Sequence, residues 1–401
     1  MATDGKIVPF HTYIWKIASR CNLNCDYCYV YNSVDKSWQD QPRYMSVDSA
    51  RATVRRMREH IITHDKDSIS IIFHGGEPLL VGVDRLRALL DIIRVGFRGT
   101  DVHPSVGIQS NGLLFDDEVG RYLIENGMSI GVSIDGPAHI NDRHRIDHVG
   151  APTSARLEER LRLLTSRYAS VFSGFLCVID IETDPVEVLD YLASWAPPSI
   201  DFLLPLDNHD RRPRGKDRER ERDVAPYGSW LVRAFDRWCE LSNPPDVRIF
   251  KSIARMLCGG DTTFEALGLL PVDLIVVESD GSIEAVDSLR TTYAGATKLG
   301  FNVFDNTFDE AASHVAVRAR QLGSLTLSAT CQRCSLVEVC GGGYLPHRWS
   351  AERGFDNPSV YCTDLQMIIR HIDARLRGAL APIMDSALLT MNSASAKNAR
   401  L

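Results

Sequence analysis

Two hydrophobic patterns alternate along the first half of the chain. Short apolar runs are typical of buried strands, whereas apolar side chains that recur every three or four residues are typical of helices with one buried face. After Ser46, for example, Val47, Ala50 and Val54 recur at helical spacing. Six strands are predicted in this way, at residues 13–18, 68–73, 106–109, 129–134, 172–179 and 200–204. Helices are predicted between them, at residues 46–61, 83–95, 116–125, 154–168 and 185–195.

This alternation predicts an α/β fold with a parallel sheet and right-handed crossovers. Six strands are too few for a closed eight-stranded barrel, so we expect an open, partial (β/α)6 barrel. Functional residues of such barrels lie at the C-terminal ends of the strands. Those ends carry Cys21, the Gly75-Gly76-Glu77 turn, Asn111-Gly112 and Asp135-Gly136. The sequence therefore predicts a site at this edge of the sheet.

The second half has a different pattern. Helices are predicted at 227–241, 249–257 and 365–376, and a hairpin at 274–277 and 282–286, where Asp280-Gly281 is a strong turn signal. We expect a barrel over residues 1–225, a helical bridge over 226–265, a small α+β domain over 266–385 and a polar tail over 386–401. The highly charged stretch 207–223 is predicted to be a solvated loop, with a binding element as the alternative.

Composition and charge narrow the class of protein. The 401 residues are 44% hydrophobic and 24% charged, with a net charge of −7, which argues against a partner nucleic acid bound through a global basic field. No apolar run reaches the roughly 18 residues that span a bilayer, and residues 1–14 lack the pattern of a secretory signal. We therefore expect a cytoplasmic protein with no nucleic-acid and no membrane partner.

Ten cysteines in a chain without an export signal need an explanation other than disulfides. Three of them, Cys21, Cys25 and Cys28, can hold a metal centre and leave one metal position open, and a structural zinc loop is the alternative. A second set, Cys331, Cys334, Cys340 and Cys362, offers four thiolates for an iron–sulfur cluster or for a zinc ion. The isolated residues Cys177, Cys239 and Cys258 are expected to be buried thiols.

The loop from Cys21 to Cys28 resembles the cysteine signature of the radical S-adenosylmethionine (SAM) enzymes. That resemblance implies a six-stranded partial barrel with a [4Fe–4S] cluster whose fourth iron is chelated by SAM. It also implies that reduction of the cluster cleaves SAM to a 5′-deoxyadenosyl radical, which abstracts a hydrogen atom from the substrate. Tyr27, at the aromatic position of the signature, would pack near the adenine.

Further positions resemble the SAM contacts of that family. The Gly75-Gly76-Glu77-Pro78 turn would receive the methionyl ammonium through its backbone and the Glu77 carboxylate. The resemblance places four further polar residues toward SAM, namely Gln109, Asn111, Ser133 and Asp135. Arg145 would meet the SAM carboxylate, with Arg143 as the alternative.

The second cysteine set resembles the SPASM extension of peptide-modifying radical enzymes, which binds two auxiliary [4Fe–4S] clusters. Here Val286 and Tyr344 stand where that pattern has cysteines. We therefore predict one SAM-binding cluster and one auxiliary [4Fe–4S] cluster, the latter held by Cys331, Cys334, Cys340 and Cys362. Asp287 matches an acid that serves as a base in sulfatase-maturing relatives, and the alternative is a structural aspartate at the hairpin end.

Segments at 202–205, 226–231, 266–268, 271–273 and 341–348 resemble the peptide maturases that form three-residue cyclophanes, including FxsB-like and Grr-type members. The resemblance implies a carbon–carbon cross-link between a β-carbon and an aromatic ring of a ribosomally synthesised precursor peptide. It also implies a flavodoxin- or ferredoxin-type electron donor. A sulfatase-maturing or thioether-forming enzyme is the alternative, and a non-catalytic zinc-binding adaptor is the alternative outside this superfamily. The few residues before Cys21 leave no room for a leader-binding domain there, so we expect the barrel mouth, the hairpin or the charged loop to recognise the precursor.

Overall fold

The computed structural model describes residues 7–216 and 224–379. Within them, ten strands form one sheet in the order β10-β9-β8-β1-β2-β3-β4-β5-β6-β7. The strands of the first half are β1 (Thr12–Ala18), β2 (Ser70–Gly75), β3 (Ser105–Ser110), β4 (Ser129–Ser133), β5 (Phe172–Val178) and β6 (Ser199–Leu203). The others are β7 (Asp246–Val247), β8 (Leu274–Val277), β9 (Ser282–Glu284) and β10 (Lys298–Asn302).

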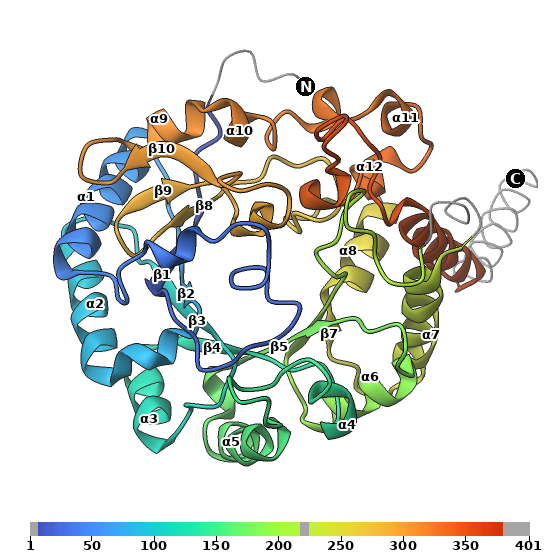
Figure 1. Cartoon of the computed structure of the whole chain (residues 1–401), viewed down its shortest axis with the longest axis horizontal. Coiled ribbons are helices and arrows are strands. Elements are labelled where there is room, and N and C mark those ends of the chain that lie inside the picture. Colours follow the sequence, from blue (N-terminus) through green and yellow to red (C-terminus); the bar gives the residue numbers. More distant parts are fainter. Residues whose placement is uncertain (1–6, 217–223, 380–401) are drawn as a thin grey trace, which may run out of the picture.

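The six predicted strands of the partial barrel are confirmed as β1 to β6. Each of them pairs with the next in parallel, and the sheet curves around the centre of the molecule with helices on its outer side (Figure 1). The main helices of this layer are α1 (Val47–Thr63), α2 (Gly82–Phe97), α3 (Asp117–Asn126), α5 (Ser154–Arg167), α6 (Pro185–Ser194) and α7 (Pro226–Glu240).

Alternation along the strands separates the core from the site. Tyr13 and Trp15 of β1 and Phe73 of β2 are fully buried, whereas His74 of β2 and Gln109 of β3, each next to a buried apolar residue, line a cavity. Because successive side chains of a strand point to opposite faces, one face of the sheet packs against other elements and the other carries polar groups. Helix α1 begins where its cap predicts, since the side chain of Ser46 accepts the backbone N–H of Ser49.

The predicted hairpin forms, but it extends the barrel sheet. Strand β8 pairs in parallel with β1, with Thr12 opposite Leu274 and Trp15 opposite Val277. The prediction of a strand to residue 286 was two residues too long, because the chain turns into the 3-10 helix η4 (Asp287–Thr291) after Val286. Strands β7 and β10 were not predicted, since β7 has two residues and β10 exposes alternate side chains. The division into domains remains a prediction.

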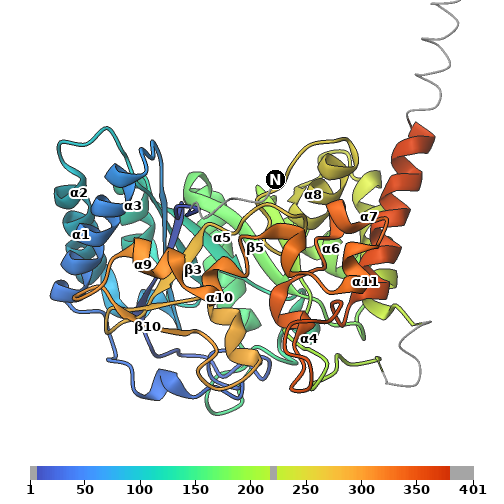
Figure 2. The same cartoon turned by 90° about the horizontal axis from the view of Figure 1, so that it is seen from above.

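Smaller helices complete the second half. They are α8 (Arg248–Leu257), α9 (Phe308–Ser313), α10 (Val315–Arg318), α11 (Ala329–Gln332) and α12 (Val337–Cys340), and α4 (Ala138–Asn141) lies in the first half. The last described helix, residues 362–379, lies beside α7 (Figure 2). No helix within 7–216 or 224–379 is long and apolar enough to cross a membrane.

The prediction of a solvated loop holds only in part for residues 207–216, because Asp210, Arg211 and Arg214 are exposed while other residues of the loop are buried. Lys216 is buried in an ion pair with Asp364 of the last helix, and the Asn208 side chain donates to the Thr291 carbonyl at 3.1 Å. The loop is therefore packed between the two halves of the chain. Its remainder, 217–223, lies outside the described residues, as do residues 1–6 of the N-terminal segment and the predicted tail at 386–401.

Candidate active site

A cavity of about 360 Å³ lies at the C-terminal ends of the strands. Gly75, Ser133 and Val178 line it at the ends of β2, β4 and β5, and Leu203 lines it at the end of β6. The loop after β1 contributes Cys21, Cys25, Tyr27, Cys28 and Tyr29, and the start of η4 contributes Asp287. The edge of the sheet that the sequence predicts is therefore the edge where the cavity lies.

The three cysteines after β1 lie in a loop that hydrogen bonds hold in place. The backbone N–H of Leu23 donates to the Cys21 sulfur at 3.3 Å, and Asn111 reaches from the end of β3 to bond Asn22 at 2.8 Å. Burial raises the pKa of the Cys21 thiol to about 12 and that of Cys25 to about 11. Buried thiols of this kind ionise when a metal centre coordinates them, so their chemistry fits an iron–sulfur cluster.

The spacing of the sulfurs also bears on the kind of metal. Tetrahedral zinc with bonds of about 2.3 Å places its ligand sulfurs roughly 3.8 Å apart. In the described part of the chain, the group of three ligand atoms within 4.8 Å of one another is that of His60, His64 and Asp309, and neither cysteine set forms such a group. Among the described residues, the His60 group and not a cysteine set therefore has the close spacing of a single-ion site.

Tyr27, Asp135 and Arg145 form one buried network on the cavity wall. The Tyr27 hydroxyl donates to Asp135 at 2.5 Å and accepts from Arg145 at 2.8 Å. Arg143, the alternative to Arg145, instead pairs with Asp180 at 3.1 Å and with Glu182. Of the two arginines, only Arg145 is a cavity residue, so it is the one placed to meet an anionic group there.

Five of the other predicted SAM contacts are cavity residues. Gly75, Gly76, Gln109, Asn111 and Ser133 line the cavity, and the Gln109 side chain donates to Ser133 at 3.0 Å. Their roles toward SAM remain predictions, and their positions agree with them.

Glu77 differs from these five residues because protein groups surround its carboxylate. Its carboxylate is fully buried and accepts hydrogen bonds from the backbone of Leu79 at 2.9 Å and of Asn111 at 2.8 Å, and from the Ser110 hydroxyl at 2.8 Å. Both oxygens accept hydrogen bonds from protein donors, so Glu77 fixes the glycine turn to the end of β3, and its role toward SAM remains a prediction. The turn needs glycine because a Cβ at Gly75 would lie 1.9 Å from the Ala18 carbonyl oxygen.

Asp287 faces this cavity from the start of η4 and is buried. Burial alone would raise its pKa, but the charge of Lys16, which forms an ion pair with it, and hydrogen bonds from Lys16 and Tyr29 hold the pKa well below its usual range. Lys16 also donates to Nδ1 of His74 at 3.0 Å. The carboxylate is therefore ionised and held in place at neutral pH.

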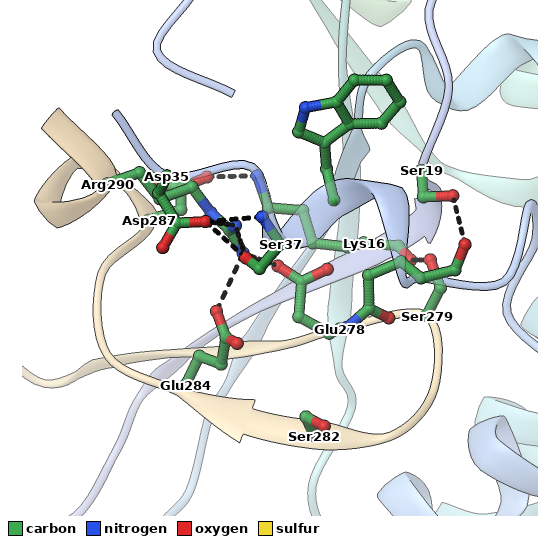
Figure 3. Close-up of polar contacts among 12 residues, drawn as sticks. Lys16, Ser19, Asp35, Ser37, Glu278, Ser279, Ser282, Glu284, Asp287 and Arg290 are labelled. Atoms are coloured by element: carbon green, nitrogen blue, oxygen red, sulfur yellow. Dashed lines mark hydrogen bonds and ion pairs between the residues drawn. The ribbon is translucent and has the colours of Figure 1, made fainter. Parts of the chain in front are cut away.

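A second buried charge cluster supports η4 (Figure 3). Arg290 bonds Asp35 at 3.2 Å, Glu278 at 2.8 Å and Glu284 at 2.9 Å. These acids come from the loop after β1 and from the hairpin, so Arg290 ties the helix that carries Asp287 to both. Burial, with the neighbouring charge of Glu284, raises the pKa of Glu278 to about 7.

Comparison with known proteins agrees with this geometry. Residues 15–192 match the family model of the radical SAM superfamily. The protein is a radical SAM enzyme. Its cofactors are therefore a [4Fe–4S] cluster and SAM, and Cys21, Cys25 and Cys28 are the residues that would hold the cluster.

Curated relatives match this radical SAM enzyme over almost its whole length. A cysteine-type anaerobic sulfatase-maturating enzyme of Clostridium perfringens is 25% identical over 379 residues, which cover 92% of this chain and 97% of the relative. A serine-type anaerobic sulfatase-maturating enzyme of Bacteroides thetaiotaomicron is 22% identical over 395 residues, which cover 94% and 91%.

Solved structures show the same fold. The structure of native anSMEcpe with bound AdoMet (SAM) has a TM-score of 0.78 and 24% identity, covering 93% of this chain and 99% of the other. Streptococcus suis SuiB bound to its precursor peptide SuiA has a TM-score of 0.53 and 13% identity, covering 85% and 73%. The α/β partial barrel with its C-terminal auxiliary region is therefore confirmed.

The second cysteine set of the radical SAM enzyme comes together from three elements. Cys331 lies in α11, Cys340 ends α12 and Cys362 begins the last helix, with Cys334 between the first two. Burial, followed by the charges of Cys362 and Cys331, raises the pKa of Cys340 to about 12. All four are free of disulfides, and their chemistry fits a second iron–sulfur cluster.

The two positions where the auxiliary pattern lacks cysteines are filled by protein contacts. Val286 lines the cavity, and the Tyr344 hydroxyl bonds Ser288 at 2.6 Å and donates to Glu265 at 2.9 Å. Glu265 also pairs with Arg320. A polar network therefore occupies the place where the sequence predicts that the first auxiliary cluster is missing.

Several residues of the site were missed in the sequence. Lys16, Tyr29 and His74 surround Asp287, and Glu265 reaches the cavity from the bridge region. A lysine inside an apolar strand, as at Lys16, was a signal that could have been used. Conversely, the prediction of buried thiols holds for Cys177 but is wrong for Cys239 and Cys258, which are exposed.

Proposed function

We propose that this radical SAM enzyme is of the sulfatase-maturating type and oxidises the side chain of a cysteine or serine residue within a peptide. The relatives that cover nearly the whole chain are cysteine-type and serine-type sulfatase-maturating enzymes. Structures of anSMEcpe hold peptides, Cp18Cys in one and Kp18Cys in another.

One observation carries the proposal: Asp287 and the cysteine triad line the same cavity. A hydrogen-abstracting centre held by the triad and an ionised carboxylate would thus face one cavity. The lining is mostly apolar, with Leu176, Val178, Phe202 and Leu203 beside the polar residues. Such a wall suits a peptide side chain that has to be held away from water.

The groups of the site have different roles in this reaction. When bound, the cluster and SAM supply hydrogen-atom abstraction from a carbon, and a second cluster at the Cys331 set supplies an acceptor for one electron. Loss of the β-hydrogen atom, one electron and the thiol or hydroxyl proton leaves a carbon–sulfur or carbon–oxygen double bond at the β-carbon. Asp287 accepts that proton, because it is the ionised carboxylate at the cavity wall.

A second candidate is the formation of a cross-link between a β-carbon and an aromatic ring of a ribosomally made peptide. The observation that favours it is the polar network of Tyr344 and Glu265, which fills the first auxiliary position. In this reaction the β-carbon loses a hydrogen atom and forms a carbon–carbon bond to the ring. The ring C–H bond then breaks, its proton goes to Asp287, and the remaining electron would go to the second cluster.

The experiment uses the anaerobically reconstituted protein with SAM and a reductant. One reaction contains the Cp18Cys peptide, and another contains a peptide without Cys or Ser in which an aromatic residue stands two positions before an aliphatic one. Water converts the carbon–sulfur double bond of oxidised Cp18Cys to an aldehyde and releases hydrogen sulfide, and an aldehyde that a hydrazide traps supports the sulfatase-maturating type. Loss of two hydrogens from the aromatic peptide, without a carbonyl, supports the cross-link. A protein that forms no 5′-deoxyadenosine contradicts both.

A further inference from the structure

Two basic side chains, Lys16 and His74, lie in a row beside Asp287. Acceptance of a proton by Asp287 does not by itself require both of them. Lys16 is a buried lysine of β1 that lies between two residues of the cavity wall, Asp287 and His74. It forms an ion pair with Asp287 Oδ2 and donates to His74 Nδ1 at 3.0 Å. The amino group therefore connects a carboxylate on the hairpin side of the cavity with an imidazole at the end of β2.

We propose that Lys16 and His74 form a proton relay that carries the proton accepted by Asp287 away from the substrate. The inference rests on the proposed function, in which Asp287 receives that proton. Lys16 and His74 act through Asp287 and are positioning residues in this scheme, whereas Asp287 is the residue that contacts the substrate.

The arrangement of donors and acceptors permits each transfer. Oδ2 of Asp287 receives both Lys16 and the Tyr29 hydroxyl, the latter at 2.8 Å, and no residue in the described ranges donates to Oδ1. Oδ1 is thus free for the substrate proton, while Oδ2 is already in contact with Lys16. His74 accepts at Nδ1, so its neutral ring carries its hydrogen on Nε2.

The step balances in protons and moves no electrons. The substrate O–H, S–H or ring C–H bond breaks and an O–H bond forms on Asp287. Asp287 then gives a proton to Lys16 as Lys16 gives one to Nδ1 of His74, and the Nε2 hydrogen of His74 leaves to water in the cavity once product departs. Asp287 and Lys16 are then in their starting states, and His74 carries its hydrogen on Nδ1 until water that enters the open site exchanges the ring protons and restores the Nε2 tautomer.

Two properties of the surroundings support a relay. Burial and the Lys16 charge lower the pKa of His74 to about 4, so the ring is neutral and able to accept at neutral pH. Lys16 is almost completely shielded from solvent, which leaves His74 as its neighbour for proton exchange.

The test separates relay from charge stabilisation through Lys16→Arg. Arginine keeps the positive charge beside Asp287 but does not give up a proton in proteins. His74→Gln keeps an acceptor for Lys16 but removes the base. The quantity measured is the amount of modified peptide formed per 5′-deoxyadenosine, because this ratio reports the steps after hydrogen abstraction and is insensitive to the amount of folded protein.

For a relay, Lys16→Arg and His74→Gln still form 5′-deoxyadenosine, and their ratio of product to 5′-deoxyadenosine falls by roughly 10- to 100-fold, as expected for loss of an assisted proton transfer. Lys298→Arg and His139→Gln are matched controls at exposed positions, and they keep the wild-type ratio. A wild-type ratio in Lys16→Arg or in His74→Gln overturns the relay. A wild-type ratio in Asp287→Asn contradicts the proposed function instead, so the two failures are distinguishable.

Discussion

Tyr27 joins the cysteine loop to two other segments of the barrel through its hydroxyl group. It is placed between Asp135, at the end of β4, and Arg145, in the segment after α4. Burial, opposed by the charge of Arg145 and supported by that of Asp135, raises the pKa of the hydroxyl well above its usual value. The group is therefore a neutral donor to Asp135 and an acceptor for Arg145.

Tyr27→Phe leaves Asp135 and Arg145 without their shared partner. Removing one member of a buried hydrogen-bonded set costs about 1–3 kcal/mol, so we expect both a lower free energy of unfolding and a rise in the dissociation constant of SAM. Thermal unfolding and equilibrium dialysis with SAM measure the two effects. Tyr168→Phe, which removes a hydroxyl bonded to Asp117 far from the cavity, is the control and leaves SAM binding unchanged.

His60 is a buried residue whose protonation state couples stability to pH. Its Nε2 accepts the backbone N–H of Phe10 at 3.0 Å, and its Nδ1 lies 2.5 Å from Asp309. Burial lowers its pKa from 6.5 to about 4, although Asp309 acts in the other direction. Between these two pH values the unfolded chain binds a proton that the folded chain does not, so folding is less favourable as the pH falls.

His60→Gln removes the part of the pH dependence of the unfolding free energy that comes from protonation of His60. Between pH 7 and pH 5 the wild type loses up to about 2 kcal/mol of unfolding free energy through this residue, because one pKa unit corresponds to about 1.4 kcal/mol. Urea unfolding at the two pH values measures the difference, and it becomes smaller in the variant by that amount. An unchanged difference contradicts the neutral state of His60, and the exposed His139→Gln serves as the control.

At the scale of elements, a single carboxylate connects three segments that are far apart in the sequence. Asp364 of the last helix accepts the backbone N–H of Gly228 in α7 at 2.9 Å and pairs with Lys216 at the end of the loop 207–216. Both charged side chains are almost completely buried. The packing of α7 and the last helix is tight at this point, because a Cβ at Gly228 would lie 2.8 Å from the Asp364 backbone.

Asp364→Ala leaves Lys216 as an uncompensated buried charge. Breaking a buried pair in this way costs about 3–5 kcal/mol, and we expect a loss of that size in the free energy of unfolding. Asp373→Ala removes an exposed pair with Arg377 on the same helix and costs at most about 1 kcal/mol. Chemical denaturation of the three proteins measures the comparison, and equal losses in the two variants contradict the role of the buried pair.

At the scale of the whole molecule, the pairing of β8 with β1 brings the two halves of the chain to one site. This pairing places Val286 and Asp287, which follow the hairpin, beside the cysteine loop that follows β1. Helices α11 and α12, which carry Cys331 and Cys340, lie in the same half of the chain as the hairpin (Figure 1). The pairing of β8 with β1 therefore joins both cysteine sets in one assembly. The predicted content of this assembly is two clusters.

Iron analysis tests that content. Two four-iron clusters give about eight iron atoms and eight sulfides per chain after anaerobic reconstitution, and Cys340→Ser should reduce the iron content to about four with 5′-deoxyadenosine formation retained. About twelve iron atoms contradict the loss of the first auxiliary cluster. About two zinc atoms without SAM cleavage support the zinc-binding adaptor.

The sequence by itself determined the parts of this protein whose cause is local. Period-two and helical patterns predicted six strands and their helices because burial of one face acts on neighbouring residues. The spacing of Cys21, Cys25 and Cys28 predicted a metal loop because three ligands of one centre have to fit within a short segment.

Tertiary structure alone decided the contacts between distant segments. It placed Lys16 and His74 beside Asp287, turned the Glu77 carboxylate toward the backbone of Asn111, and packed the charged loop against the last helix. Each of these depends on which buried charges meet after the chain folds, and a buried charge is stable only where a partner from another element compensates it. The spacing of residues along the sequence therefore does not predict which of these buried charges come into contact.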